Sequence, residues 1–191
     1  MASMIDRVIR AVKLDKDFYN EAERDTSLNQ EALLIVIIVS LASAIGSFIS
    51  GIISGEIGGA LLSAVLTIVI GIGGYYLWAY VTLFVGKQFF QGDADIGEML
   101  RTLGYAHAPR LLGLLSFIPC VGAIFALAGF VLSLVAAVIA IREAMDFDTG
   151  KAVVTAIIGW AIVLVISIIL SVILGVGAAG VGGIMSALQG R

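Results

Sequence analysis

The sequence predicts an all-α, polytopic membrane protein with five transmembrane helices, a short N-terminal amphipathic helix and a kinked third span. The first observation behind this fold class is that 60% of the 191 residues are hydrophobic and 13% are charged, with a mean hydropathy of +1.10. Soluble domains are about half apolar and about a quarter charged, so this chain has too few charges to cover a soluble surface. The second is a series of uncharged apolar runs long enough to cross a bilayer. The third is an alternation of basic and neutral connections between these runs.

The first predicted unit, residues 1–31, is a charged cytoplasmic segment with five of the eleven basic and seven of the fourteen acidic residues. It lacks the apolar stretch and small-residue cleavage site of a signal peptide, so we expect the first apolar run to remain as an anchor. Two locations for its amphipathic helix stay open, the lipid headgroup region and the cytoplasmic face of the bundle. The apolar face of this helix consists of Ile5, Val8, Ile9 and Val12.

Four spans of the predicted transmembrane domain, residues 32–175, are uninterrupted apolar runs, and a glycine-rich tail, residues 176–191, follows them. Ser27 and Gln30 fit a capping box at the start of the first span. Aromatic residues gather in the second half of the second span, which suits a membrane interface, a helix contact or a cavity. The four spans cover residues 32–53, 60–85, 121–141 and 152–175, and the aromatic residues are Tyr75, Tyr76, Trp78 and Tyr80.

The third span is less regular because two prolines interrupt it. The stretch from Pro109 to Pro119, about ten residues, makes only about 15 Å of helix, half of a hydrocarbon core. Either a helix begins near Ile96 and passes through Pro109 with a kink, or this stretch is half of a re-entrant hairpin. We favour the kinked crossing, because Asp95 and Glu98 form a plausible helix start and the longer helix would reach about 34 Å.

The basic residues of the connections predict the orientation. The N-terminal segment has five, residues 51–59 and the turn at Pro119 have none, and the tail has only Arg191. This alternation requires five spans, a cytoplasmic N-terminus and an extracytoplasmic C-terminus in the cell membrane. The remaining basic residues, all in the intervening cytoplasmic connections, are Lys87, Arg101, Arg110, Arg142 and Lys151.

Small residues repeat every fourth position in three spans and predict the helix seams of the bundle, because close backbone approach drives helix association in lipid. The same stripes could serve self-association. Gly175, Gly177 and Gly180 match a dinucleotide-binding pattern, but they follow a membrane span and lack a downstream acidic residue, so we interpret them as a helix end. The stripes are Ser43/Ser47/Gly51, Gly129/Ser133/Ala137 and Ser167/Ser171/Gly175.

A candidate polar site is predicted on the cytoplasmic side, at the start of the third span. His107 and Arg110 are three residues apart and therefore share a helix face. We expect Arg110 to pair with Glu143 or to extend toward the headgroups. Pro109 frees a backbone carbonyl one turn earlier, near Tyr105, which a neighbouring side chain or water must satisfy.

Acidic residues in two connections are interpreted as helix caps, with a loose cation site as the alternative. They are Asp93, Asp95, Asp146 and Asp148. With one histidine and one cysteine, Cys120, the chain offers no catalytic triad and no metal site of the usual spacing. We therefore predict no catalytic residue, no cofactor and no metal.

The chain resembles the Yip1 domain family of five-span membrane proteins. The resemblance rests on the N-terminal segment, on TLGYAHAP at Thr102–Pro109 and on REAMDFDTGKAVVTAIIGW at Arg142–Trp160. It implies that Tyr105 and Pro109 are characteristic positions and that no residue is catalytic. Eukaryotic relatives are associated with Rab-type GTPases and have a much longer N-terminal segment. This chain is similar to the compact bacterial or archaeal version, so GTPase binding is not carried over.

Together these features predict a non-enzymatic scaffold or accessory subunit that contacts the bilayer and other membrane proteins, or itself as a homo-oligomer. Nucleic acid is not an expected partner. The scaffold predicts a dry bundle packed on small residues. The alternative is a small-solute or ion transporter, with Tyr105, His107 and Arg110 at a cytoplasmic mouth. A polar cavity lined by Thr67, Tyr75, Tyr76 and Thr82 would then be required.

Overall fold

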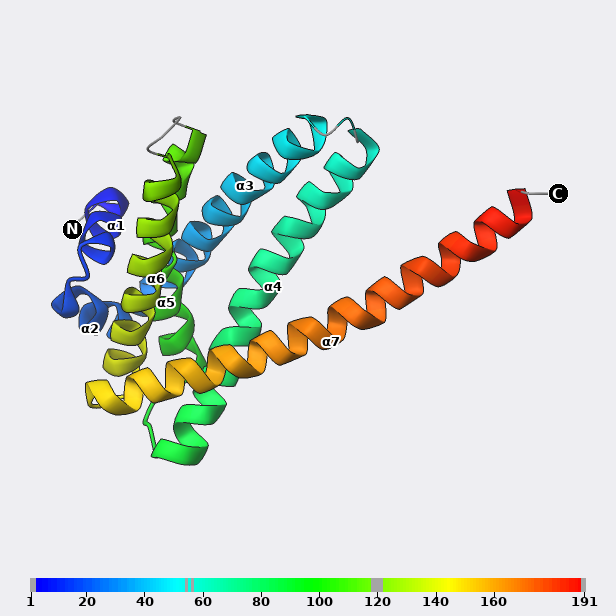
Figure 1. The fold of residues 1–191 in the computed structure, drawn as a ribbon. Helices are drawn as coiled ribbons and strands as arrows, with labels where there is room; N and C mark the ends of the chain where they lie inside the picture. Colours follow the sequence, from blue (N-terminus) through cyan, green and yellow to red (C-terminus); the bar gives the residue numbers. More distant parts are fainter. Residues whose placement is uncertain (1–2, 54, 56, 118–121, 190–191) are drawn as a thin grey trace.

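The computed structural model describes residues 3–53, 55, 57–117 and 122–189, and these residues form helices joined by short connections (Figure 1). Two short helices and a 3₁₀ turn come first, and longer apolar helices follow. The elements are α1 (Met4–Val12), α2 (Lys16–Arg24), η1 (Thr26–Leu28), α3 (Asn29–Ile53), α4 (Ile57–Phe90), α5 (Ile96–Ala106), η2 (Ala108–Phe117), α6 (Gly122–Ala144) and α7 (Thr149–Gln189).

Four helices of the described part of the chain, α3, α4, α6 and α7, are long and apolar enough to cross a membrane. Most of their large apolar side chains, such as Ile53, Val69 and Leu127, are exposed, as they must be in helices that face lipid. The protein is therefore a polytopic membrane protein. The predicted second span ends too early at residue 85, because α4 continues to Phe90.

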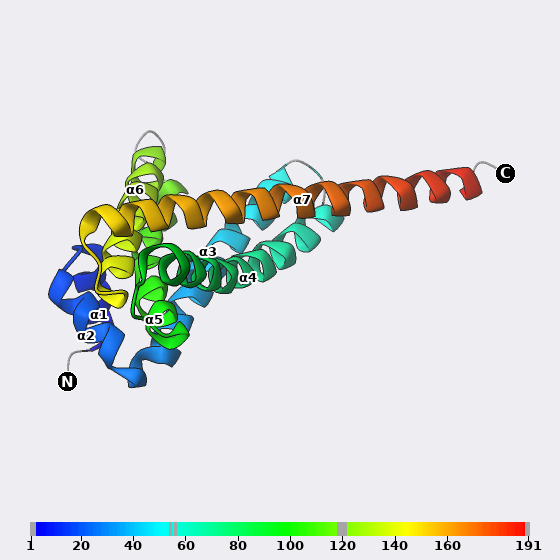
Figure 2. The same cartoon turned by 90° about the horizontal axis from the view of Figure 1, so that it is seen from below.

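The helices alternate in direction. α3 and α4 run side by side and antiparallel, α6 lies beside α5 and η2, and α7 crosses α4 and extends away from the other helices toward the C-terminus (Figures 1 and 2). The C-terminal ends of α3 and η2 lie at one end of the molecule, and those of α4 and α6 lie at the other (Figure 1).

The third predicted span consists of two helical pieces, and the change between them falls at His107. The α-helix α5 ends at Ala106, and the 3₁₀ helix η2 begins one residue before Pro109, whose ring and missing N–H interrupt an α-helix. The two pieces together cover about 36 Å, close to the length of α6. Whether this segment crosses the bilayer stays a prediction, and the expected turn at Pro119 and Cys120 lies outside the described residues.

Two of the three predicted small-residue stripes are helix seams. A Cβ added at Gly51 would lie 2.6 Å from the Cβ of Ala60 in α4, and one added at Gly129 would lie 2.7 Å from the Pro109 carbonyl oxygen. In the third stripe Ser167 is exposed, and the side chains of its two partners are outside the described set. The seam of α7 instead uses Gly159, which lies against Thr82.

The N-terminal helices pack on the bundle instead of forming a separate tail. Phe18 and Tyr19 are fully buried. Val8 packs against the core, whereas Ile5 on the same helix is 71% exposed. The bundle thus covers one part of the predicted apolar face, and the other part is free to meet headgroups.

The predicted cap at Ser27 is wrong. Asp25 is the capping residue, because its carboxylate accepts hydrogen bonds from the Ser27 N–H at 3.0 Å and the Ser27 hydroxyl at 2.6 Å. The shorter aspartate reaches the exposed N–H groups of η1, a turn that the sequence pattern did not indicate.

Candidate functional site

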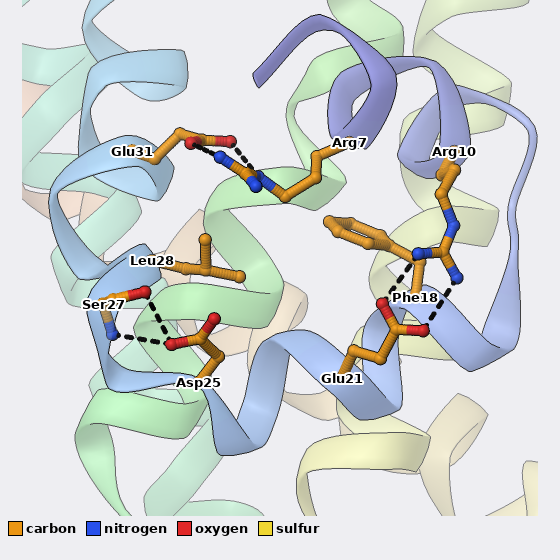
Figure 3. Close-up of a pocket in the computed structure, with 8 residues that line it drawn as sticks. All are labelled: Arg7, Arg10, Phe18, Glu21, Asp25, Ser27, Leu28 and Glu31. Atoms are coloured by element: carbon orange, nitrogen blue, oxygen red, sulfur yellow. Dashed lines mark hydrogen bonds and ion pairs between the residues drawn. The ribbon is translucent and has the colours of Figure 1, made fainter. Parts of the chain in front are cut away.

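A groove lies between the N-terminal helices and the start of α3, and we call it the N-terminal groove. Its volume is about 410 Å³. Charged side chains form its rim, and Phe18 lies between the two arginines (Figure 3). The lining residues are Arg7, Arg10, Phe18, Glu21, Asp25, Ser27, Leu28 and Glu31.

Ion pairs hold the walls of the N-terminal groove. The Arg7 guanidinium donates two hydrogen bonds to the Glu31 carboxylate, one of them at 2.8 Å. Arg10 donates to Glu21 at 2.7 Å and to Asp15 at 2.7 Å, and its guanidinium lies 5.2 Å from the centre of the Phe18 ring. Arg10 holds the pKa of the Asp15 carboxyl below its ordinary value, chiefly through this hydrogen bond. These bonds fix α1 against α2 and α3.

Tyr105 lies beneath this groove and not beside His107. Its hydroxyl donates to Glu31 at 2.5 Å, and its ring meets the edge of Phe18 with a centroid separation of 4.8 Å. The predicted polar site is therefore divided, because Tyr105 faces the N-terminal helices whereas His107 faces α4.

Arg101 is a structural residue that sequence reasoning counted only as a basic charge in a connection. It is buried, and it donates to the backbone carbonyls of Ala22 at 3.0 Å and of Glu23. A third hydrogen bond reaches the side chain of Asn29 at 3.1 Å. Arg101 thus satisfies the last carbonyls of α2 and ties that helix to α5. One signal was available, an arginine inside an otherwise apolar face of a short helix.

A second cavity, which we call the central cavity, lies between α3, α4 and η2. It has a volume of about 310 Å³. Both His107 and Arg110 line it, so the structure brings this predicted pair together. The complete lining is Val39, Ser40, Ser43, Thr67, Ile70, Gly71, His107 and Arg110.

Aromatic rings from α4 enclose His107. Its ring contacts the edges of Tyr75 and Trp78, with centroid separations of 5.7 and 6.4 Å. Its Nδ1 lies 2.8 Å from the Leu103 carbonyl oxygen. A carbonyl oxygen only accepts, so Nδ1 carries the proton, and Nε2 carries the lone pair in the neutral ring. Since aromatic contacts and this bond hold it, His107 is a wall of the cavity.

The predicted ion pair between Arg110 and Glu143 is wrong. Glu143 accepts two hydrogen bonds from its neighbour Arg142, one of them at 2.8 Å. The backbone of Arg110 lies beside Gly129, fourteen residues before Glu143 and therefore about 21 Å from it along α6. That separation is too long for a direct contact between the two side chains.

The break at Pro109 is satisfied by a neighbouring helix. The Ser133 hydroxyl donates to the Ala106 carbonyl at 2.8 Å, and Ala106 follows Tyr105 directly. The expectation that a side chain satisfies a carbonyl one turn before the proline is confirmed, with the carbonyl displaced by one residue. This bond also explains why Ser133 stays buried in the seam of α6.

The acidic connections contain two caps. Asp95 and Glu98 form a complete capping box at the start of α5, and Asp148 accepts from the Lys151 N–H at 3.0 Å at the start of α7. Asp146 occupies a left-handed turn at φ 51°. Among the residues that the structure describes, no three His, Cys, Asp or Glu side chains come together as a metal site. Asp93 and the other three therefore have no added support as cation ligands.

The four residues proposed to line a transport cavity lie in different parts of the structure. Thr67 lines the central cavity, but Tyr75 donates its hydroxyl to the Leu100 carbonyl at 2.6 Å, and Tyr76 packs against the Tyr75 ring. Thr82 lies in the seam with α7. Serines of α3 replace these residues in the cavity wall.

Comparison with protein families gives one finding that covers nearly the whole chain. The model of the Yip1 domain matches residues 14–186, which confirms the resemblance seen in the sequence. The search of curated proteins and the search of solved structures gave no match.

Proposed function

Since the chain belongs to the Yip1 domain family, we propose that it is a non-enzymatic membrane scaffold whose N-terminal helices bind a partner protein at the cytoplasmic surface. The observation that carries this proposal is the N-terminal groove, with its volume of about 410 Å³ and its fixed walls. A preorganised surface binds with less entropy loss than a free tail. The buried Phe18 and Tyr19 provide that preorganisation.

The charges of the groove favour a partner segment with a basic residue. Two arginines and three carboxylates line it, so its formal net charge is +2 − 3 = −1. Most of these charges are already paired, but the Glu21 side chain remains 61% exposed. Exposed rim charges influence partner choice and association rate more than they influence affinity.

Site-specific crosslinking tests this proposal on the full-length protein in its native membrane. A photoreactive residue at Ser27 should give a discrete crosslinked partner, and the same residue at the exposed Gln88 should not. Replacing Glu21 with Lys in the Ser27 background should weaken the adduct by several-fold. An adduct equally strong at both positions, or insensitive to the charge reversal, would argue against partner binding in the groove.

The central cavity supports a second candidate, transport of a small solute or ion. The scaffold predicted a dry bundle, yet serine, threonine, histidine and arginine side chains line this cavity. Flux through proteoliposomes should fall at least tenfold in a His107→Ala/Arg110→Ala variant that folds normally. Equal flux in the unchanged protein and in the variant, or no flux above protein-free vesicles in the unchanged protein, would argue against transport through this cavity.

A further inference from the structure

Arg110 differs from the other five arginines that the structure describes. The other five all hold hydrogen-bonded partners, either carboxylates or, for Arg101, backbone carbonyls and an asparagine. Arg110 is an exposed residue that also lines the central cavity, and its side chain has no hydrogen bond or ion pair to any described residue. Within a bilayer, an exposed guanidinium without a counter-charge is costly, and a bound anion would neutralise it.

Arg110 also lies far from both ends of the bundle. It shares the central cavity with Ser40 and Ser43, which are about 16 to 21 Å from the start of α3, in a helix about 37 Å long. The described carboxylates belong to the N-terminal segment, to the first turns of α3 and α5, to the last turn of α6, or to the connections that precede α5 and α7. The protein itself therefore supplies no neutralising charge at this depth among the described residues.

One hydroxyl beside Arg110 has an uncommitted proton. Ser43 donates to the Val39 carbonyl at 2.9 Å, and Thr67 donates to the Ser63 carbonyl at 2.7 Å. Ser40 has no described hydrogen-bond partner, although it is only 5% exposed and lines the same cavity. A hydroxyl that lines a cavity without a protein partner can donate its hydrogen bond to a bound anion.

We propose that the central cavity binds one small monovalent anion, a halide or a small carboxylate, between the Arg110 guanidinium and the Ser40 hydroxyl. The fixed charge of the cavity is +1 above neutral pH, where a histidine such as His107 is mainly uncharged. A guanidinium fork matches a carboxylate in two-point contact and also suits a spherical halide. Neither partner docking nor flux is required for binding, so this inference stands or fails separately from the proposed functions.

A lateral groove gives the anion a route to Arg110. The lateral groove has a volume of about 470 Å³ and shares Val39, Ser43 and Arg110 with the central cavity. It continues toward the C-terminal ends of α3 and η2. At Gly46 and Gly113 an added Cβ would meet nothing within 4 Å, so the groove is open at both positions. Gly46 is therefore a position where a larger side chain can be introduced into the lining of the route, because its Cβ meets no other atom within 4 Å.

Chloride-35 NMR line widths of the full-length protein in detergent at pH 8 test the proposal. We expect saturable excess broadening that acetate displaces. The broadening should be lost, with at least a tenfold weaker apparent affinity, in Arg110→Gln, and should weaken several-fold in Ser40→Ala. Lys87→Gln removes the same charge from an exposed position and should leave the affinity unchanged.

Two further variants keep the test decisive if the Arg110 change impairs folding. Gly46→Leu retains Arg110 and should slow chloride exchange or abolish binding, whereas Gly73→Leu, at an exposed and equally open glycine, should not. Unchanged broadening in Ser40→Ala and Gly46→Leu would overturn the proposal. So would equal losses in Arg110→Gln and Lys87→Gln, because they would indicate only bulk electrostatic attraction.

Discussion

At the scale of single residues, Glu23 is the least satisfied carboxylate among the described residues. One of its oxygens accepts from Arg24, and the other is buried without a partner. Burial raises the pKa of the Glu23 carboxyl above its ordinary value of 4.5; the hydrogen bond from Arg24 opposes this shift, and the negative charge of Asp146 adds to it. The fold therefore favours the protonated form of this residue.

This raised pKa predicts a loss of stability with rising pH. Because the folded state holds the proton more tightly than the unfolded state, the contribution of Glu23 is complete below pH 4.5 and is lost as pH rises through the higher folded pKa. Glu23→Gln should remove this part of the pH dependence and stabilise the protein at pH 7 by about 1 kcal/mol. The free energy of unfolding in detergent, measured from pH 4 to 8, tests this prediction. Identical pH profiles for the unchanged protein and Glu23→Gln would contradict it.

The Tyr105 hydroxyl predicts a second effect at this scale. Hydrogen bonds to charged groups contribute about 1.5 to 3 kcal/mol, so Tyr105→Phe should lower the free energy of unfolding by about that amount. It should also loosen α1, because Glu31 binds both Tyr105 and Arg7. Tyr80→Phe at a 56% exposed position is the control and should have little effect. Stability equal to that of the unchanged protein, with normal protease resistance of residues 1–31, would contradict this role.

At the scale of the helices, local signals were enough to predict the caps of α5 and α7 and most of the apolar spans, whereas the predicted cap at Ser27 was wrong. Asp95 with Glu98 and Asp148 act through neighbours three residues away, so their spacing in the sequence contains the interaction. The seams at Gly51 and Gly129 were predicted for a similar reason, since small residues at every fourth position line one side of a helix.

The partner of Arg110 could not be predicted in this way. Its distance from Glu143 depends on how η2 is aligned along α6, and a 3₁₀ helix advances about 2.0 Å per residue where an α-helix advances about 1.5 Å. The contacts of Tyr105 could not be predicted for the same reason, because the fold of the N-terminal helices decides which side chains Tyr105 meets. Contacts between distant segments, and not local propensity, divided the predicted polar site.

The seam between α6 and η2 gives a prediction for an element. Gly129→Ala should destabilise the bundle by about 1 to 3 kcal/mol, because its new Cβ would press on the backbone carbonyl of Pro109, which cannot rotate away. Gly73→Ala, where the added Cβ meets nothing within 4 Å, is the matched control and should be neutral or slightly stabilising. Thermal unfolding in detergent compares the stabilities of the two variants. Equal stability of Gly129→Ala and Gly73→Ala would show that the seam can relax.

At the scale of the whole molecule, the connections separate into two ends, and the N-terminal helices gather near the end that holds the last turns of α4 and α6 (Figure 1). We propose that this end is cytoplasmic and that residues 1–31 act as a platform on the bundle of residues 32–175. The predicted helix end at Gly175 is wrong, because α7 continues to Gln189. The four helices of spanning length leave one question, whether α5 and η2 make the fifth crossing. Five crossings put the termini on opposite sides of the membrane, and four put them on the same side.

Cysteine labelling in intact cells tests the five crossings. In a Cys120→Ser background, Gln189→Cys should react with a membrane-impermeant maleimide from outside, whereas Asp17→Cys should react only after permeabilisation. The native Cys120, in the predicted external turn, should label like Gln189→Cys. Labelling of Asp17→Cys and Gln189→Cys from the same side would exclude five crossings. Such a result would make the segment containing Arg110 a re-entrant one, because an α5–η2 pair of about 36 Å that failed to cross would have to return to the side it entered.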